Sequence, residues 1–133
     1  MTAQADAADV DVTLPLAVTL ANFSAAQVGA QARLAWETVS EVDHLGFDVY
    51  RGLSQDGPWS RVNDALIPSA SPGSTAGHIY ELLDPLALPP GVTWYRLVAV
   101  DVHRVAVIVG TVSIEPATVE RRLWLPVMAR SGP

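Results

Sequence analysis

Two neighbouring segments of the chain alternate apolar and polar residues, and this pattern most constrains the fold. Residues 32–37 read ARLAWE, and residues 46–51 read GFDVYR. A period of two is the pattern of a β-strand with one face buried and one face solvated. The two segments therefore predict successive strands. Trp36, Phe47 and Val49 lie on the sides that we expect to face the core.

Further segments of the same kind follow along the chain. We expect strands from residue 14 to about 23 and over 59–62, 80–82, 93–101 and 105–114, in addition to the two above. Residues 63–78 are rich in Ser, Gly and Pro and predict a long loop. No segment has the apolar spacing and caps of a helix, which disfavours a parallel sheet with crossover helices. About seven short strands predict an all-β sandwich.

Composition limits the partners of the chain. Its 133 residues carry a formal net charge of −6, and half of them are apolar. This length and composition predict one globular domain. The longest basic cluster is Arg121-Arg122, so nucleic acid and anionic membrane surfaces are poor partners. Cysteine is absent, which excludes a disulfide framework, thiolate zinc ligands and a thiol nucleophile.

The two ends of the sequence differ from its centre. Residues 1–13 are small and acidic without periodicity, which predicts a disordered leader or linker. They lack the cationic start and apolar core of a secretory signal. The longest aliphatic run, over residues 105–109, is far shorter than the ~20 residues that cross a bilayer, so we expect no membrane insertion.

Residues 14–116 resemble a fibronectin type III domain of the kind found near the C-termini of bacterial secreted and cell-surface proteins. The matching pieces are LP at 14–15, LANFS at 20–24, LAWET at 34–38, SEV at 40–42, GFDVYR at 46–51, DGPW at 56–59, PG at 90–91 and WYRLVAVD at 94–101. The resemblance implies an immunoglobulin-like β-sandwich of about seven strands with fibronectin type III topology.

One position departs from that family. Its members place a tyrosine near the start of the sixth strand, and the hydroxyl of this tyrosine bonds back to the preceding loop. Here the position falls on Trp94 or, when the strand itself is aligned, on Thr93. If Thr93 occupies it, we expect Trp94 to point outward and Leu86 or Leu88 to hold the corner by packing.

The resemblance also implies a context. It predicts a non-catalytic spacer or protein-interaction module of a larger exported bacterial protein, extracellular or at the cell surface. Its partners are then neighbouring domains of the same polypeptide or another protein. Residues 117–133 form either a tail or an extra edge strand that packs Leu123 and Leu125 on the sandwich. Residues 121–128 are also similar to an aromatic-Leu-Pro stretch at the ends of some exported bacterial proteins.

Three aromatic residues are the candidate contacts for a ligand or partner: Tyr50, Trp59 and Trp94. Exposed rings of this kind stack on sugars or anchor a protein partner. A carbohydrate-binding module is therefore the alternative function, with a glycan as partner. Val98 and Val100 share the outward face with Trp94, and we expect residues 105, 107 and 109 to extend this apolar strip.

Other polar residues predict no catalytic, cofactor or metal site. Glu37, Glu41, Asp43 and His44 cluster around the loop between the first two strands described above, where the acidic side chains are expected to be solvated. We expect the three histidines to lie in different loops. A remoter alternative places an enzyme site in the 63–78 loop, if Asp64, His78 and Asp84 converge. No catalytic motif is present, so we expect no enzyme.

Overall fold

The computed structural model of the chain describes residues 18–70 and 73–117, and these residues form strands without any helix. The strands are β2 (Thr19–Val28), β3 (Gln31–Ser40), β4 (His44–Gly52), β5 (Ser60–Arg61), β6 (Ile67–Pro68), β7 (Ile79–Leu83), β8 (Thr93–Asp101) and β9 (Ala106–Ile114). The all-β prediction is confirmed. Among the described residues, no helix has the length and apolarity needed to cross a membrane. The predicted leader, residues 1–13, and residues 118–133 of the predicted tail lie outside the described residues.

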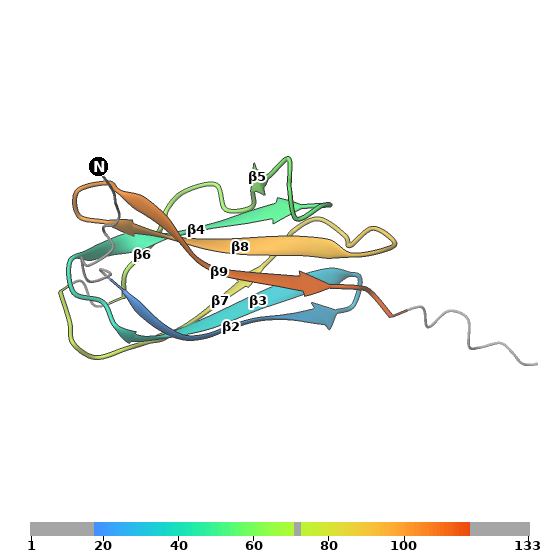
Figure 1. Ribbon diagram of the computed structural model, residues 1–133. Coiled ribbons are helices and arrows are strands. Elements are labelled where there is room, and N and C mark those ends of the chain that lie inside the picture. Colours follow the sequence, from blue (N-terminus) through green and yellow to red (C-terminus); the bar gives the residue numbers. More distant parts are fainter. Residues whose placement is uncertain (1–17, 71–72, 118–133) are drawn as a thin grey trace, which may run out of the picture.

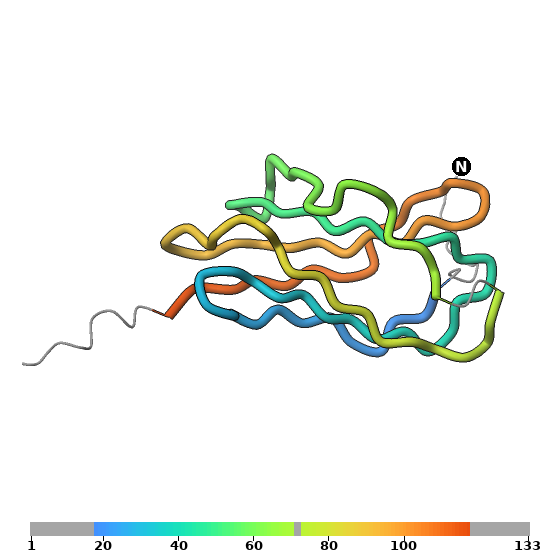
Figure 2. Tube along the Cα trace, turned by 180° about the vertical axis from the view of Figure 1, so that it is seen from behind, coloured from blue at the N-terminus to red at the C-terminus, as the bar shows by residue number. Residues whose placement is uncertain are grey.

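The strands form two antiparallel sheets that pack in two layers. One sheet has the order β2-β3-β7, and the other has the order β5-β4-β8-β9, with β6 paired to β4. The layers are seen edge-on in Figure 1, and Figure 2 shows from behind that β2 and β9 lie along one edge of the sandwich. The described residues hold eight strands rather than about seven, because the predicted long loop contains the two-residue strand β6.

The core lies between the two sheets and is aromatic at its centre. Trp36 on β3 is 1% exposed, and its ring stacks on Tyr80 with a centroid separation of 5.5 Å. Phe47 on β4 packs against the edge of the Trp36 ring at 5.4 Å. Such ring pairs stabilise the fold beyond the area that they bury. Trp36 and Phe47 are core residues, as predicted, so a binding surface must use other side chains.

Candidate binding surfaces

The three predicted contact residues lie around the outer face of the β5-β4-β8-β9 sheet, and two of them come together. Tyr50 on β4 and Trp59, just before β5, line the same groove. Trp94 on β8 pairs with Gly52 and is not among the residues that line it. All three side chains are partly buried. The structure therefore brings together Tyr50 and Trp59 and leaves Trp94 beyond the groove.

The groove has a volume of about 290 Å³ and is lined mainly by apolar side chains: Tyr50, Trp59, Arg96, Val98, Ala106 and Ile108. Strand register explains this set. Tyr50 lies opposite Arg96, and Val98 lies opposite Ile108, so these side chains share one face of the sheet. Apolar residues on a solvent-facing sheet surface indicate a contact surface.

Arg96 covers one of the aromatic rings of this groove. Its guanidinium carbon lies 4.1 Å from the centroid of the Trp59 ring, which is a cation–π contact. Arg96 Nη2 donates a hydrogen bond of 3.4 Å to the carbonyl of Gln55. The buried Nε–H of Arg96 has no hydrogen-bond partner among the described residues. The groove thus combines an apolar lining with a guanidinium that lies over one of its aromatic rings.

The prediction that residues 105, 107 and 109 extend the outer apolar strip is wrong, because Ala106 and Ile108 of β9 share that face instead. The register between β8 and β9 shifts at Leu97 and Val98, so the neighbours of Val98 and Val100 are Ile108 and Ala106. Val109 instead packs against the core. A β-bulge changes which residues share a face, and alternation read from the sequence cannot locate it.

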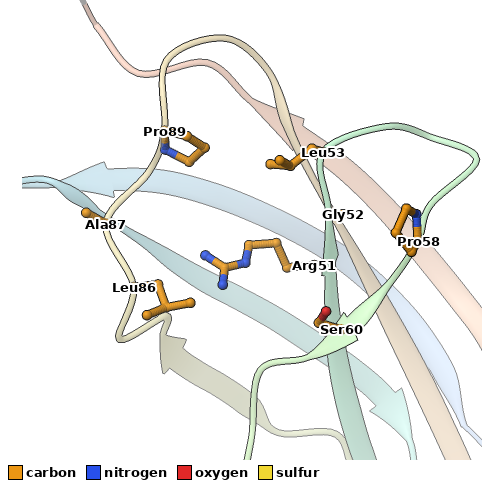
Figure 3. Close-up of a pocket in the computed structure, with 8 residues that line it drawn as sticks. All are labelled: Arg51, Gly52, Leu53, Pro58, Ser60, Leu86, Ala87 and Pro89. Atoms are coloured by element: carbon orange, nitrogen blue, oxygen red, sulfur yellow. The ribbon is translucent and has the colours of Figure 1, made fainter.

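A second cavity, of about 550 Å³, opens at one end of the molecule between two loops, as Figure 3 shows. One wall is the segment from Gly52 to Ser60, and the other is the loop after β7. The lining residues are Arg51, Gly52, Leu53, Pro58, Ser60, Leu86, Ala87 and Pro89. The Arg51 side chain reaches into the cavity between the two walls (Figure 3). We call this cavity the Arg51 cleft.

Arg51, which lines the cleft, forms an ion pair with the buried side chain of Asp84. Arg51 Nη1 lies 3.1 Å from Oδ2 of Asp84, whose side chain is 1% exposed. The same carboxylate oxygen accepts a 2.6 Å hydrogen bond from the hydroxyl of Tyr95, and Oδ1 accepts one from the Leu86 N–H. Burial, followed by the hydrogen bond and the charge of Asp84, raises the pKa of the Tyr95 hydroxyl well above its usual value.

This ion pair lies near the start of β8, the region of Thr93 and Trp94. Thr93 is buried, Trp94 lies on the outer face, and Leu88 packs against the core while Leu86 is exposed. Of the two leucines expected to pack at this corner, Leu88 contacts the core and Leu86 does not. The Tyr95–Asp84 hydrogen bond ties the loop after β7 to β8 as well, and the sequence pattern gave no sign of it.

The acidic cluster expected on a solvated loop is partly buried, and that expectation is wrong for Glu41 and His44. Glu41 is fully buried and accepts hydrogen bonds from the hydroxyls of Thr38, Ser69 and Tyr80. Burial alone would raise the pKa of the Glu41 carboxyl, but these hydrogen bonds bring it below its usual value. Ser69 belongs to the long predicted loop, so Glu41 fastens that loop to β3 and β7 of the first sheet.

Two of the three histidines lie near Glu41, and of these only His44 departs from the expected loop position, because it begins β4. His44 is the first residue of β4 and is buried, and burial lowers its pKa despite the opposing charges of Glu41 and Asp101. His78 Nδ1 lies 3.9 Å from Glu41 Oε2. No group of three or more metal-ligating side chains occurs within 18–70 and 73–117. Linear spacing does not show that residues 41 and 78 meet, because their approach depends on how the loop folds back.

The residues of the remoter enzyme alternative have separate surroundings. Asp84 is paired with Arg51 and Tyr95, whereas His78 lies beside Glu41. Asp64 is exposed, and its backbone carbonyl accepts a hydrogen bond from Arg61. These contacts give no support to a shared acid–base site.

No known family model matches the sequence, and no curated protein matches it. Among solved structures, the chain is similar to the pectate lyase Pel3 from Pectobacterium carotovorum, with 17% identity and a TM-score of 0.49. The match covers 75% of this chain and 27% of the lyase chain. Because that protein is an enzyme, the prediction that the chain is not an enzyme is contradicted and is withdrawn. A likeness this low assigns no catalytic activity to this chain.

Proposed function

We propose that the chain is a fibronectin type III-like module that serves a larger exported bacterial protein, outside the cell or at its surface, as a spacer or protein-interaction domain. The strand orders β2-β3-β7 and β5-β4-β8-β9 support this proposal, together with the fibronectin-like segments of the sequence. Its binding surface is the groove on the outer face of the second sheet.

The observation that carries this proposal is the apolar groove itself. Ile108 is 53% exposed, and it stands beside the aromatic rings of Tyr50 and Trp59. A protein partner that covers this surface removes apolar area from water and fills a shaped depression.

A glycan-binding module remains the alternative, and two contacts disfavour it. Stacking on sugar requires a free ring face, but Arg96 covers one face of Trp59. Trp94 lies outside the groove and does not extend a platform with the other two rings. We expect a glycan array to show no binding. Glycan binding that disappears in Trp59→Ala would replace the protein partner with a carbohydrate.

Site-specific photo-crosslinking tests the protein-binding surface. The parent protein is produced in its native host with the photoreactive amino acid benzoylphenylalanine in place of Ile108. Ile79 on β7, which is 72% exposed, provides the matched control position. We expect a discrete protein crosslink, within the parent polypeptide or to a second protein, from position 108 and none from position 79. Equal crosslinking from both positions, or none from 108, contradicts the proposal.

A further inference from the structure

The Arg51 cleft has an exposed apolar rim that the proposed function does not use. Leu53 on one wall is 67% exposed, and Leu86 on the other is 55% exposed. Pro58 on the first wall and Pro89 on the second also line the cleft, so both walls carry apolar side chains (Figure 3). A cleft with two apolar walls and a lining arginine fits an apolar segment that also offers a hydrogen-bond acceptor.

The charge inside the cleft selects against an anionic occupant. Arg51 is already paired with the buried carboxylate of Asp84, so the charge of this lining arginine is already balanced. A second carboxylate beside Arg51 would lie close to Asp84, and like charges at short range in a partly buried site repel strongly. The guanidinium has five donors, which leaves others for a neutral acceptor such as a backbone carbonyl. The occupant is therefore an uncharged apolar peptide.

The chain itself carries such a peptide near the cleft. Residues 123–127 read LWLPV and contain no charged group, and they follow the last described residue, Ala117, by six positions. The N–H of Ala117 donates a hydrogen bond of 2.9 Å to Oε1 of Gln27 on β2. This contact fixes where the following segment starts.

The distance from Ala117 to the cleft can be estimated from hydrogen-bonded neighbours on adjacent strands. Gln27 pairs with Ala32 on β3, and the Ala32 carbonyl accepts a hydrogen bond from the N–H of Asp84. Two strand spacings separate the three positions, which is roughly 10 Å. Six residues span up to about 20 Å when extended. Residue 123 is thus within reach of the cleft from Ala117.

Electrostatic attraction also favours contact between this segment and the rest of the chain. Residues 118–133 contain three arginines and one glutamate, so the segment is basic, while the whole chain carries a net charge of −6. A basic segment is attracted to an acidic domain, and the separation involved here is about one or two Debye lengths at physiological salt. We propose that residues 123–127 of the same chain occupy the Arg51 cleft, between Leu53 and Leu86.

Disulfide pairing tests this proposal in the full chain. The sequence has no cysteine, so two introduced cysteines form a unique pair. Leu86→Cys is combined with Leu123→Cys or with Leu125→Cys, and the effective concentration of each thiol pair is measured in a glutathione redox buffer. Ile108→Cys and Ile79→Cys, combined with the same two tail positions, serve as controls because both isoleucines are exposed. We expect the better Leu86 pair to exceed both controls at least tenfold.

A further variant separates docking from simple proximity. Leu53→Asp, on the opposite rim, places a charge in the apolar entrance at an exposed position that the fold tolerates. We expect it to lower the effective concentration of the Leu86 pair at least fivefold. Equal values for the three positions, a maximum at Ile108, or no response to Leu53→Asp each overturns the proposal.

Discussion

Among single residues, Glu41 joins more parts of the molecule than any other side chain described above. One buried carboxylate accepts hydrogen bonds from Thr38 on β3, from Ser69 in the loop and from Tyr80 on β7. A buried acceptor that binds three hydroxyls is costly to remove, because each hydroxyl loses its partner at once.

Glu41→Ala tests this role. We expect it to lower the free energy of unfolding by about 3 kcal/mol, since buried hydroxyls are left without an acceptor. Glu37→Ala, at an exposed position of the adjacent strand, is the control and should change it by less than about 0.5 kcal/mol. Urea denaturation measures both variants. A Glu41→Ala cost that equals the Glu37→Ala cost would show that the buried network adds nothing to stability.

His44 and Glu41 also predict how stability responds to acid. The folded-state pKa of His44 lies below its ordinary value of 6.5, so the unfolded chain takes up its proton first as pH falls. Stability from His44 is therefore present above pH 6.5 and is lost as pH falls below it. The folded-state pKa of Glu41 lies below 4.5, so its contribution is lost below pH 4.5 by the same reasoning.

Urea midpoints between pH 7 and pH 5 measure the histidine contribution. We expect the wild-type midpoint to fall over this range, and we expect a smaller fall in His44→Phe, which cannot be protonated. The comparison uses the change with pH within each protein, so a lower overall stability of the variant does not affect it. An identical fall in both proteins would assign the acid sensitivity to other groups.

At the level of strands, the close approach of the long loop to β3 sets a limit on side-chain size. A Cβ atom on Gly77 would stand 1.7 Å from the backbone carbonyl oxygen of Thr38. The neighbouring His78 carbonyl accepts a hydrogen bond from the Thr38 N–H at 2.9 Å. Backbone atoms cannot move aside as flexible side chains do, so only glycine fits here.

Gly77→Ala should therefore push the start of β7 away from β3. We expect a loss of about 2 kcal/mol or more in the free energy of unfolding, in the range seen for overpacked interiors. Ala76→Ser, at the exposed neighbouring position, should cost less than about 0.5 kcal/mol. Chemical denaturation of the two variants gives the comparison. A Gly77→Ala protein as stable as Ala76→Ser would contradict the close approach.

Strand positions follow from the sequence where alternation and turn residues act locally. The predicted strand over 93–101 agrees with β8, and the prediction over 105–114 differs from β9 by one residue. Features that depend on pairing between distant segments are not visible in the alternation. The register shift between Leu97 and Val98 changed which residues of β9 lie on the outer face. Ser69 and His78 approach Glu41, so a carboxylate predicted to be solvated is part of a buried network.

The sequence predicted some of the residues of the candidate surface but not all of them. Tyr50 and Trp59 stand out in the sequence as aromatic residues at strand edges, and both line the groove. Arg96, which covers Trp59, and Ile108, which completes the apolar wall, were not singled out. Their roles arise from cross-strand register, which one sequence does not specify.

On the scale of the whole molecule, the two surfaces serve different partners in this account. The outer-face groove receives a protein partner, while the Arg51 cleft receives residues 123–127 of the chain itself. The surfaces share no lining residue, so variants in one should leave the other intact. Tyr50→Ala, in the groove, is expected to weaken the partner crosslink formed from position 108 and to leave the Leu86 thiol pair unchanged. A loss of both would show that the two surfaces act together.

The central claim is that the groove of Tyr50, Trp59 and Ile108 is covered by protein in the native assembly. Hydroxyl-radical oxidation, detected by mass spectrometry, measures the exposure of individual side chains. The two samples are the isolated chain and the parent protein in its native assembly. We expect oxidation of these three side chains to fall at least fivefold in the native assembly, while oxidation of Ile79 stays the same. Equal oxidation of the groove residues in the two samples would contradict it.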